Sequence, residues 1–405
     1  MIKAASRTRN FTYAIRNIVA EAKKLEREGR EVIYLNIGDP VLYGFNTPPH
    51  VVQALERALR DGRNGYAPST GILEAREAVA RESISRGINI SADDVVITSG
   101  ASEAVDIVLS ALLEPGDEVL APTPGYPLYT AVVSKLGSQE RTYRLDPTNN
   151  WEPSVEDIRA AITPRTRAIV IINPNNPTGA VYSRKKLLEV LAVAEEAGLV
   201  VLADEVYWRL TYEQQAPPIA SLVDDRVPVI TFESLSKIYL APGWRLGWMK
   251  LSNSHLMGDL KTGINKLADA RLCSPGPAQY AVAAALEGDH SYLEDVMRRF
   301  RDRRDLTHQR INAIKGMNCS LPGGAFYVMA QIERLDGATD EEFVLSLLRE
   351  TGILFVHGSG FGMNKADGYF RIVYLPEPEV LNLVFDRVQK FAEAWRPSAR
   401  ATLKR

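Results

Sequence analysis

The sequence contains little cysteine: Cys273 and Cys319 are the only two, and they form no C-x-x-C pair. Neither a disulfide framework nor a structural zinc site is indicated, and a reducing compartment such as the cytoplasm fits best. The five histidines are also scattered without metal-ligand spacing, so we expect no bound metal. They are His50, His255, His290, His308 and His357.

No charge of one sign dominates, because 48 lysines and arginines face 50 acidic residues and the net charge is -2. A nucleic-acid-binding domain would be basic, so we expect no nucleic-acid partner. Charged residues or proline interrupt every apolar stretch before it reaches the length of a membrane span, which excludes a spanning helix. The N-terminus has no apolar secretory signal. It is rich in arginine like a transit peptide, a reading that we favour less.

Short apolar runs at 95–98, 118–121, 168–172, 199–203 and 227–232 each end in a polar turn, and helix-like segments follow. This alternation predicts an α/β protein with a mostly parallel sheet. After about residue 290 a long charged amphipathic segment and shorter strands indicate a second, smaller α+β domain. We expect three parts: 1–45 as an N-terminal arm that also contributes to the small domain, 46–289 as the large domain, and 290–405 as the rest of the small one.

The unusual polar residues follow the predicted strands, and ligands of open α/β sheets bind at the carboxyl ends of the strands. Lys237 lies in SLSKIYLAPGWRLGW, where the neighbours are uncharged. Most lysines are solvated surface charges. This setting would instead lower the pKa of the amine and favour Schiff-base chemistry. Ser234, Ser236 and Arg245 would suit a phosphate ester.

Three further motifs are compatible with a site or with plain structure. SGASEA at 99–104 opens a helix and could bring backbone amides to a phosphate, although such turns are more often plain loops. Asp204 ends an apolar strand and is either a helix N-cap or a partner for a protonated pyridine nitrogen. NPNNPTG at 173–179 is either a tight turn or a means of projecting Asn176 beside Asp204.

In combination these residues resemble the fold-type I pyridoxal-phosphate-dependent aminotransferases of class I and II, over essentially the whole chain. The chain looks most like the alanine (glutamate-pyruvate) branch, through Y-x-I-R at 13–16, NIGDP at 36–40, IVIINPNNPTGAVYS and RLC-x-x-x-PAQ at 271–279. The resemblance implies a large domain with a mostly parallel sheet of the seven-stranded type, flanked by helices. It also implies reversible, ping-pong transamination between L-alanine and 2-oxoglutarate.

The resemblance further implies roles for single residues. Lys237 would hold pyridoxal phosphate and move the substrate proton, and Asp204 would pair with the ring nitrogen. Asn176 and Tyr207 would bond the phenolic oxygen, with Tyr126 stacked on the ring. The phosphate would be held by Ala101, Ser102, Ser234, Ser236 and Arg245, and by Tyr66 of a neighbouring subunit, which makes a homodimer expected.

For the substrate, Arg371 in GYFRIVYL would bind the α-carboxylate with its two-pronged fork, helped by Asn176 and the backbone of Gly38. A buried arginine in an apolar strand is costly without an anion, which favours the same role independently. Tyr13, Arg16 and Tyr129 would close over the side chain of the substrate. Arg271 is a second candidate for the distal carboxylate of glutamate.

Other functions remain open from the sequence. HGSGFG at 357–362 could suggest a dehydrogenase, but its glycines are not spaced as G-x-G-x-x-G and no suitable helix follows, so we expect a turn. A non-catalytic sensor would need an added DNA-binding domain. Aspartate, aromatic or broad-specificity aminotransferases and β-lyases share the same cofactor residues, and these are the serious alternatives.

Overall fold

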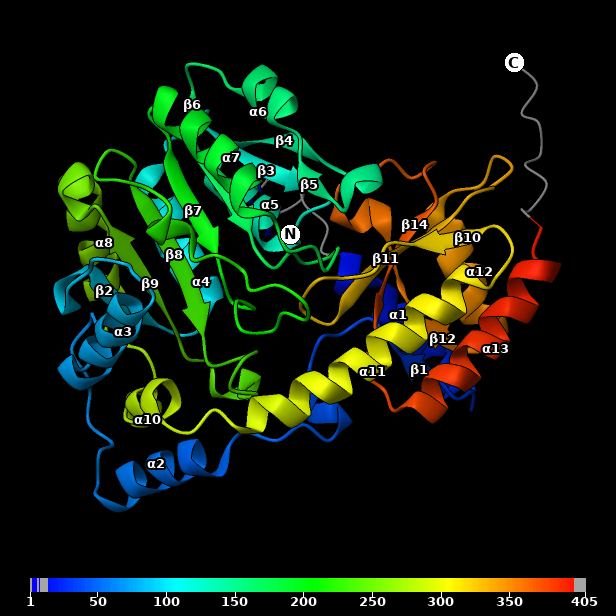
Figure 1. Ribbon diagram of the computed structural model, residues 1–405, viewed down its shortest axis with the longest axis horizontal. Helices are drawn as coiled ribbons and strands as arrows, with labels where there is room; N and C mark the ends of the chain where they lie inside the picture. The colour runs from blue at the N-terminus through cyan, green and yellow to red at the C-terminus, as the bar shows by residue number, and fades with distance from the viewer. Residues whose placement is uncertain (1, 6, 8–13, 397–405) are drawn as a thin grey trace.

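The computed structural model describes residues 2–5, 7 and 14–396, with side chains from residue 18 onward in the last range. Figure 1 shows two lobes, a large one around a broad twisted sheet and a small one that contains most of the last hundred residues. The large sheet has the strand order β2-β9-β8-β7-β6-β3-β4-β5. Its strands are β2 (Val95–Thr98), β3 (Glu118–Thr123), β4 (Gln139–Asp146), β5 (Glu152–Pro153), β6 (Thr166–Ile172), β7 (Val200–Asp204), β8 (Val229–Ser234) and β9 (Gly247–Ser252).

The sheet is mostly parallel, as the sequence predicts. β3, β4, β6, β7 and β8 pair in parallel, whereas β9 runs antiparallel to both β8 and β2. Seven strands have four or more residues, and the eighth, β5, adds only two residues antiparallel to β4 at the edge. The expected seven-stranded type of sheet is therefore confirmed, with one short extra strand.

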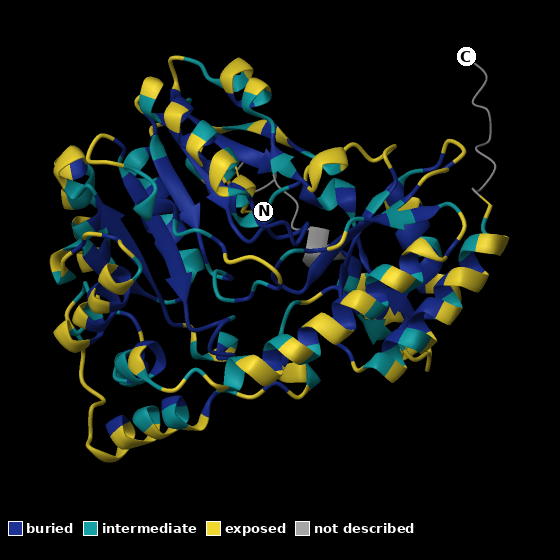
Figure 2. Cartoon of the chain, in the orientation of Figure 1, coloured by how far each residue is buried: buried dark blue, intermediate teal, exposed yellow. Residues whose placement is uncertain are grey.

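Alternate residues of the central strands face two separate apolar cores, because successive side chains of a strand point to opposite faces. Ile169, Ile171 and Val201 belong to one core, and Val170 and Leu202 belong to the other. Figure 2 shows these strands as buried, whereas the exposed residues lie on the outer helices and the loops. The helices of this lobe are α2 (Pro49–Arg60), α3 (Leu73–Ser85), α4 (Ala101–Leu112), α5 (Pro127–Leu136), α6 (Val155–Ala161), α7 (Arg184–Glu196), α8 (Gly258–Arg271), α9 (Gly276–Gln279) and α10 (Val282–Glu287).

The small lobe combines both parts of the chain that the sequence assigns to it (Figure 1). β1 (Ile33–Tyr34), which follows helix α1 (Ala14–Arg27), pairs in parallel with β12 (Ile353–Leu354). A second sheet has the order β10-β11-β14-β13 and is antiparallel. Its strands are β10 (Met317–Cys319), β11 (Tyr327–Ile332), β13 (Val356–His357) and β14 (Tyr369–Val373), and its helices are α11 (Tyr292–Asn312), α12 (Asp340–Thr351) and α13 (Pro378–Ala394). The domain limits at residues 45 and 289 stay a prediction.

Two features differ from a simple reading of the pattern. β4 and β9 were not among the predicted strands, because β4 is rich in charged residues and β9 contains Lys250, which is completely buried. Residues 206–209 after Asp204 form a turn rather than the expected helix. No helix among the described residues is long and apolar enough to cross a bilayer.

Candidate active site

Lys237 lies just after β8 at the carboxyl edge of the large sheet. Its Nζ donates a hydrogen bond to the carbonyl oxygen of Gly38 at 2.7 Å and lies 5.8 Å from the centre of the Phe326 ring. Burial lowers the pKa of the Lys237 amine from 10.5 to about 8, with Arg371 and Arg245 acting in the same direction and Asp39 against it. About a tenth of this amine is therefore neutral and nucleophilic at pH 7, far more than for a lysine of ordinary pKa.

Asp204, the last residue of β7, is a buried carboxylate with few partners. It accepts a hydrogen bond from Tyr129 Oη at 3.1 Å and one from the backbone N–H of Val206 at 3.4 Å. Burial raises the pKa of Asp204 to about 6, and these two hydrogen bonds oppose the rise. A buried carboxylate held this way is suited to a cationic partner such as a protonated ring nitrogen.

The expected place of Tyr129 over the substrate side chain stays a prediction. Tyr129 is 1% exposed in α5 and is one of the residues that line a cavity between the two lobes. Its hydroxyl also donates to Asp204, so Tyr129 contacts the buried carboxylate and borders the cavity.

The residues expected to hold a phosphate meet at the start of α4. Gly100, with φ of 84°, turns the chain into Ala101 and Ser102 at the first turn of the helix, where backbone N–H groups point outward. Arg245 Nη2 lies 3.5 Å from the carbonyl oxygen of Ser99, and the Ser236 N–H donates to Ser234 Oγ at 3.2 Å.

Glycine is required at this point of the structure. A Cβ at Gly100 would lie 2.6 Å from Arg245 Nη2, so the small residue leaves room for the guanidinium beside the helix start. Backbone amides, two serine hydroxyls and an exposed arginine form a cradle suited to a phosphate group.

Arg371 is 2% exposed on β14 of the small lobe and faces the same site. Its Nη1 donates to Asn176 Oδ1 at 2.9 Å, and its Nη2 donates to the carbonyl oxygen of Asn36. The rings of Tyr327 and Phe361 each have their centres 4.7 Å from the guanidinium carbon. The structure thus brings Arg371 and Asn176 together across 195 residues of sequence.

Tyr327 and Phe326 belong to the site although the sequence analysis did not single them out. Tyr327 Oη lies 2.9 Å from Tyr207 Oη, and a Cβ at Gly38 would lie 2.1 Å from the same hydroxyl. The signal available in the sequence was their position in the apolar strand beside GYFRIVYL, but only strand pairing shows that they line the site.

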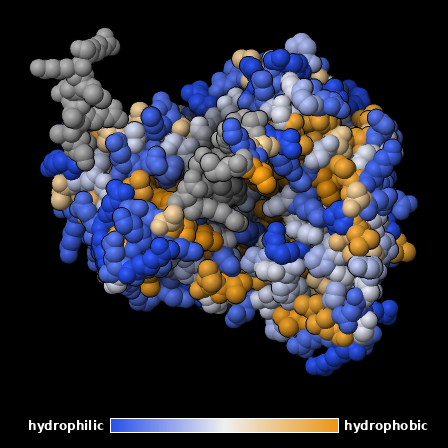
Figure 3. Space-filling model, turned by 180° about the vertical axis from the view of Figure 1, so that it is seen from behind, coloured by the Kyte–Doolittle hydropathy of each residue, from blue (hydrophilic) through white to orange (hydrophobic). Residues whose placement is uncertain are grey.

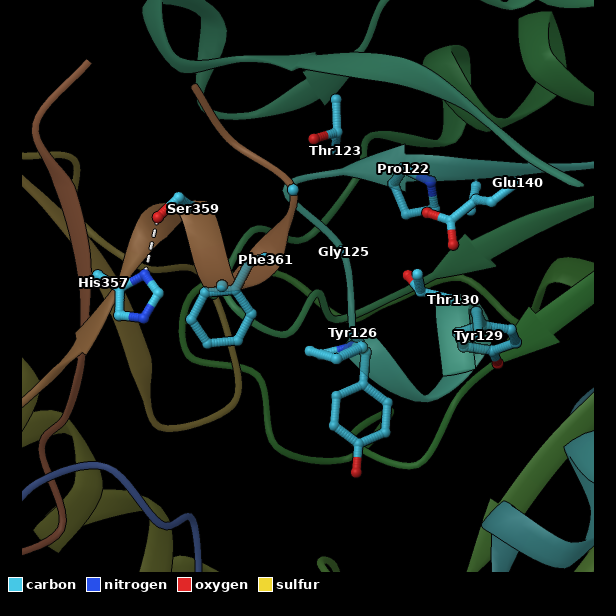
Figure 4. A pocket seen from close by; sticks show the side chains of 14 residues that line it. Pro122, Thr123, Gly125, Tyr126, Tyr129, Thr130, Glu140, His357, Ser359 and Phe361 are labelled. Carbon is cyan, nitrogen blue, oxygen red and sulfur yellow. Dashed lines mark hydrogen bonds between the residues drawn. The ribbon is translucent and has the colours of Figure 1, made fainter. Parts of the chain in front are cut away.

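A cavity of about 280 Å³ opens between the two lobes beside Tyr126. Figure 4 shows Tyr126, Thr130 and Glu140 from the large lobe and His357 and Phe361 from the small lobe around it. The backbone N–H of Gly125 donates to the carbonyl oxygen of Phe361 at 3.0 Å, which joins the lobes at this point. Tyr126 is thus placed at the boundary between the sheet edge and an open space.

Several expected site residues are not part of this cluster. Arg271 Nη2 donates to the carbonyl oxygens of Ser69 and Ile97, and its Nη1 lies 3.4 Å from Glu103 Oε2. Tyr66 is 85% exposed. Tyr13 lies outside the described residues, as does the side chain of Arg16, whose backbone belongs to α1.

The glycines of HGSGFG form a short 3-10 turn, Gly358–Phe361, as expected, and not a dinucleotide-binding loop. Within the described part of the chain no group of three or more His, Cys, Asp or Glu side chains is placed to hold a metal ion. Cys273 and Cys319 are both free thiols.

Comparison with known proteins identifies the family. Residues 30–386 match the family model of aminotransferase class I and II. The chain is 39% identical to the glutamate-pyruvate aminotransferase AlaA of Escherichia coli, over 97% of this chain and 98% of that protein. It is 38% identical to an alanine aminotransferase of Mycobacterium tuberculosis, over 97% and 93% of the two chains.

Among solved structures, an alanine aminotransferase from Pyrococcus furiosus superimposes with a TM-score of 0.94 at 42% identity, covering 97% of this chain and all of the other. Sequence and fold agree along the whole length. The chain belongs to the class I and II aminotransferases, enzymes that depend on pyridoxal 5′-phosphate.

Proposed function

We propose that this aminotransferase transfers the amino group of L-alanine to 2-oxoglutarate, reversibly, giving pyruvate and L-glutamate. One observation carries the proposal: a buried lysine amine with a pKa of about 8 follows β8, next to the end of β7 where the buried Asp204 lies, and the buried Arg371 is near enough to lower that pKa. The names of the similar proteins favour alanine and glutamate as the substrates.

The residues present fit pyridoxal phosphate at each of its functional groups. Amides at the start of α4, the hydroxyls of Ser234 and Ser236 and the guanidinium of Arg245 would hold the phosphate. Asp204 would face the ring nitrogen and Tyr126 would stack on the ring. Asn176 and Tyr207 would bond the phenolic oxygen. When bound, the cofactor supplies a carbonyl group for an amine and an electron sink for the substrate carbanion.

The chain's own groups perform the remaining work. Lys237 Nζ would accept the α-proton of the amino acid and return a proton later in the transfer. Asp204, ionised next to a cation, would keep the ring nitrogen protonated, and its burial would exclude the water that weakens such a pairing.

Arg371 would bind the α-carboxylate of the substrate. Its guanidinium already donates to two oxygen acceptors, and a carboxylate can take the place of either in a two-pronged geometry. The aromatic rings of Tyr327 and Phe361 fix the plane of the guanidinium, so the amino acid is held with its α-carbon toward Lys237.

We further propose that Tyr13 and Arg16 close over the substrate side chain, where Arg16 would meet the distal carboxylate of glutamate. We favour Arg16 over Arg271, because Arg271 Nη2 already donates to the carbonyl oxygens of Ser69 and Ile97 and its Nη1 lies 3.4 Å from Glu103. An aminotransferase specific for aspartate or for aromatic amino acids, or one of broad specificity, is the alternative. The residues proposed to hold the cofactor do not distinguish these enzymes from an alanine aminotransferase.

Half-reactions with single amino acids test the substrate. We expect the purified yellow enzyme to lose the absorption band of its bound cofactor on addition of L-alanine or L-glutamate, and pyruvate to restore it. If only L-aspartate or an aromatic amino acid changes the spectrum, the substrate assignment is wrong although the family is not. Turnover by a Lys237→Ala variant would contradict the role of the lysine.

We also propose a homodimer in which Tyr66 completes the phosphate site of the neighbouring subunit. Large apolar side chains are exposed on the large lobe and the segment before it: Val41, Leu42, Leu59, Tyr66, Leu73 and Leu272. Figure 3 shows apolar patches on the surface seen from behind. Sedimentation of the wild-type enzyme should give twice the chain mass. When Lys237→Ala chains are mixed with Tyr66→Ala chains, a mixed dimer has one site with both Lys237 and the neighbour's Tyr66. The activity that the mixture gains measures how much the Tyr66 hydroxyl acts across subunits.

A further inference from the structure

A cluster of charged side chains is buried behind the cofactor site, on the other face of the sheet. Glu205 directly follows Asp204, and Glu233 directly precedes Ser234. Because side chains alternate along a strand, Glu205 and Glu233 point away from the face on which Asp204 lies and toward α3. They are 1% and 2% exposed.

Arg86, at the C-terminal end of α3, bridges these two carboxylates. Its Nη1 lies 2.6 Å from Glu233 Oε1 and its Nη2 lies 3.0 Å from Glu205 Oε2. The guanidinium carbon lies 3.7 Å from the centre of the Trp208 ring. The Arg86 side chain therefore links the ends of two adjacent strands, β7 and β8. Each of these strand ends also carries a residue of the proposed site.

Other groups hold the same two carboxylates from the remaining sides. Lys250 Nζ on β9 lies 2.7 Å from Glu233 Oε1, and Trp248 Nε1 donates to Glu233 Oε2 at 3.0 Å. The backbone N–H of Ile219 donates to Glu205 Oε1 at 2.7 Å. Although burial works against it, the two cations Lys250 and Arg86 hold the pKa of Glu233 down to about 2.

The cluster is balanced in charge, because Glu82, Glu205 and Glu233 face Arg86, Arg209 and Lys250. Glu82 lies 3.5 Å from Arg86 and 3.9 Å from Arg209. Buried ion pairs contribute little net stability compared with apolar residues of similar size, since both charges lose their hydration. A cluster of this cost behind a functional site calls for a reason other than stability. The position of the cluster offers one, because Glu205 and Glu233 are each the direct neighbour in sequence of a proposed site residue.

We propose that Arg86 is a positioning residue for the cofactor site. By binding Glu205 and Glu233 together, it fixes the ends of β7 and β8 and so sets the distance between Asp204 and the Ser234 hydroxyl. The inference rests on the proposed assignment of Asp204 to the ring nitrogen and of Ser234 to the phosphate. The ring nitrogen and the phosphate belong to one small molecule, so the protein groups that bind them must lie at a matching separation.

The test compares Arg86→Lys with Arg86→Met and with Arg81→Lys. Lysine keeps the positive charge at position 86 but has a single nitrogen, which cannot reach both carboxylates in the geometry of the fork. Arg81 is the matched control, because it lies in the same helix and pairs with Glu287 at 2.8 Å on the surface. Each apoenzyme is titrated with pyridoxal phosphate, and the pH midpoint of the bound cofactor's absorption band and the thermal midpoint of the apoenzyme are measured.

We expect Arg86→Lys to bind the cofactor about ten- to a hundredfold more weakly, the range found when groups that orient the ligands of a metal from behind are removed. Its spectral pH midpoint should also shift, because Asp204 moves relative to the ring. Arg81→Lys should match the wild type in both. Arg86→Met removes a positive charge beside Glu205 and Glu233. If this variant folds, it should bind the cofactor still more weakly.

A merely structural role would lower the thermal midpoint of Arg86→Lys and leave its dissociation constant and spectral midpoint at the wild-type values; that result overturns the inference, whether or not Arg86→Met folds. If the wild-type apoenzyme itself fails to bind pyridoxal phosphate, the assignment of the site is overturned first, and the inference falls with it.

Discussion

The Tyr129 hydroxyl donates a hydrogen bond of 3.1 Å to Asp204, in a buried contact between α5 and the end of β7. Burial and the neighbouring Asp204 raise the pKa of Tyr129 well above its usual value, so the phenol stays protonated and remains a donor throughout the working pH range. The hydrogen bond orients the carboxylate and opposes the rise of its pKa. If Asp204 pairs with the ring nitrogen as proposed, Tyr129 would act on the cofactor through Asp204.

Replacing Tyr129 by Phe should slow the half-reaction with L-alanine about tenfold or more, because a hydrogen bond to a buried charge contributes about 1.5–3 kcal/mol. The measurement is the single-turnover rate of spectral change. Tyr143→Phe is the control, since its hydroxyl donates to the carbonyl oxygen of Val170 away from the site. Equal rates in the two variants would remove Tyr129 from the mechanism.

Asp204 should cost the apoenzyme stability. Its folded-state pKa of about 6 lies above the usual 3.8, so between about pH 4 and pH 6 the folded chain binds more protons than the unfolded chain. Stability therefore falls as pH rises through this window, and above it the cost is about 3 kcal/mol.

An Asp204→Asn apoenzyme should accordingly be more stable than the wild type at pH 7.5, and the difference should vanish near pH 4. Urea unfolding at both pH values measures it. Asn at exposed Asp224 should give no such gain. A less stable Asp204→Asn apoenzyme at pH 7.5 would mean that the carboxylate is better compensated than its contacts indicate.

Lys237 should control how fast the apoenzyme captures the cofactor. Because burial lowers its pKa to about 8, the capture rate should rise about tenfold per pH unit below 8 and level off above it. Stopped-flow absorbance between about pH 6 and pH 10 gives the profile. A rate that continues to rise up to pH 10 would show an ordinary surface-like lysine.

Gly100→Ala should weaken cofactor binding, because the added Cβ would lie 2.6 Å from Arg245 Nη2 in a backbone conformation with φ of 84°. Gly116→Ala is a matched control with φ of 93° and nothing within 4 Å of the added atom. Both should lose about 1 kcal/mol of stability from backbone strain. Only Gly100→Ala should raise the dissociation constant of pyridoxal phosphate in apoenzyme titration, and equal effects would exclude the proposed cradle.

Arg371→Lys should raise the KM for L-alanine about a hundredfold while the cofactor still binds, since loss of a two-pronged carboxylate contact costs about 2–3 kcal/mol. Steady-state kinetics and the cofactor spectrum separate the two effects. Arg310→Lys, which alters a pairing with Asp386 between α11 and α13, is the control. An unchanged KM would place the α-carboxylate elsewhere.

The strand-end positions of Asn176, Asp204 and Lys237 could be predicted from the sequence because the pattern is local. A run of buried β-branched residues forms a strand, and parallel strands present their carboxyl ends at one edge. The α/β architecture, the small second lobe and the cofactor chemistry follow from the same local signals together with the resemblance of the motifs. The strands β4 and β9 could not be predicted in the same way, because polar or charged residues interrupt their apolar pattern.

Tertiary structure decided the pairings between these positions. Tyr129 meets Asp204 because α5 brings its hydroxyl to the end of β7, and Arg371 reaches Asn176 and Asn36 because β14 of the small lobe faces the large sheet. Arg86 is an ordinary helix-end arginine in the sequence, and only the adjacency of β7 and β8 brings Glu205 and Glu233 within reach of one guanidinium. Sequence determined which residues could carry charge and chemistry. The order of strands in the sheet determined their partners, because a hydrogen bond extends about 3 Å and its two ends come from segments far apart in the chain.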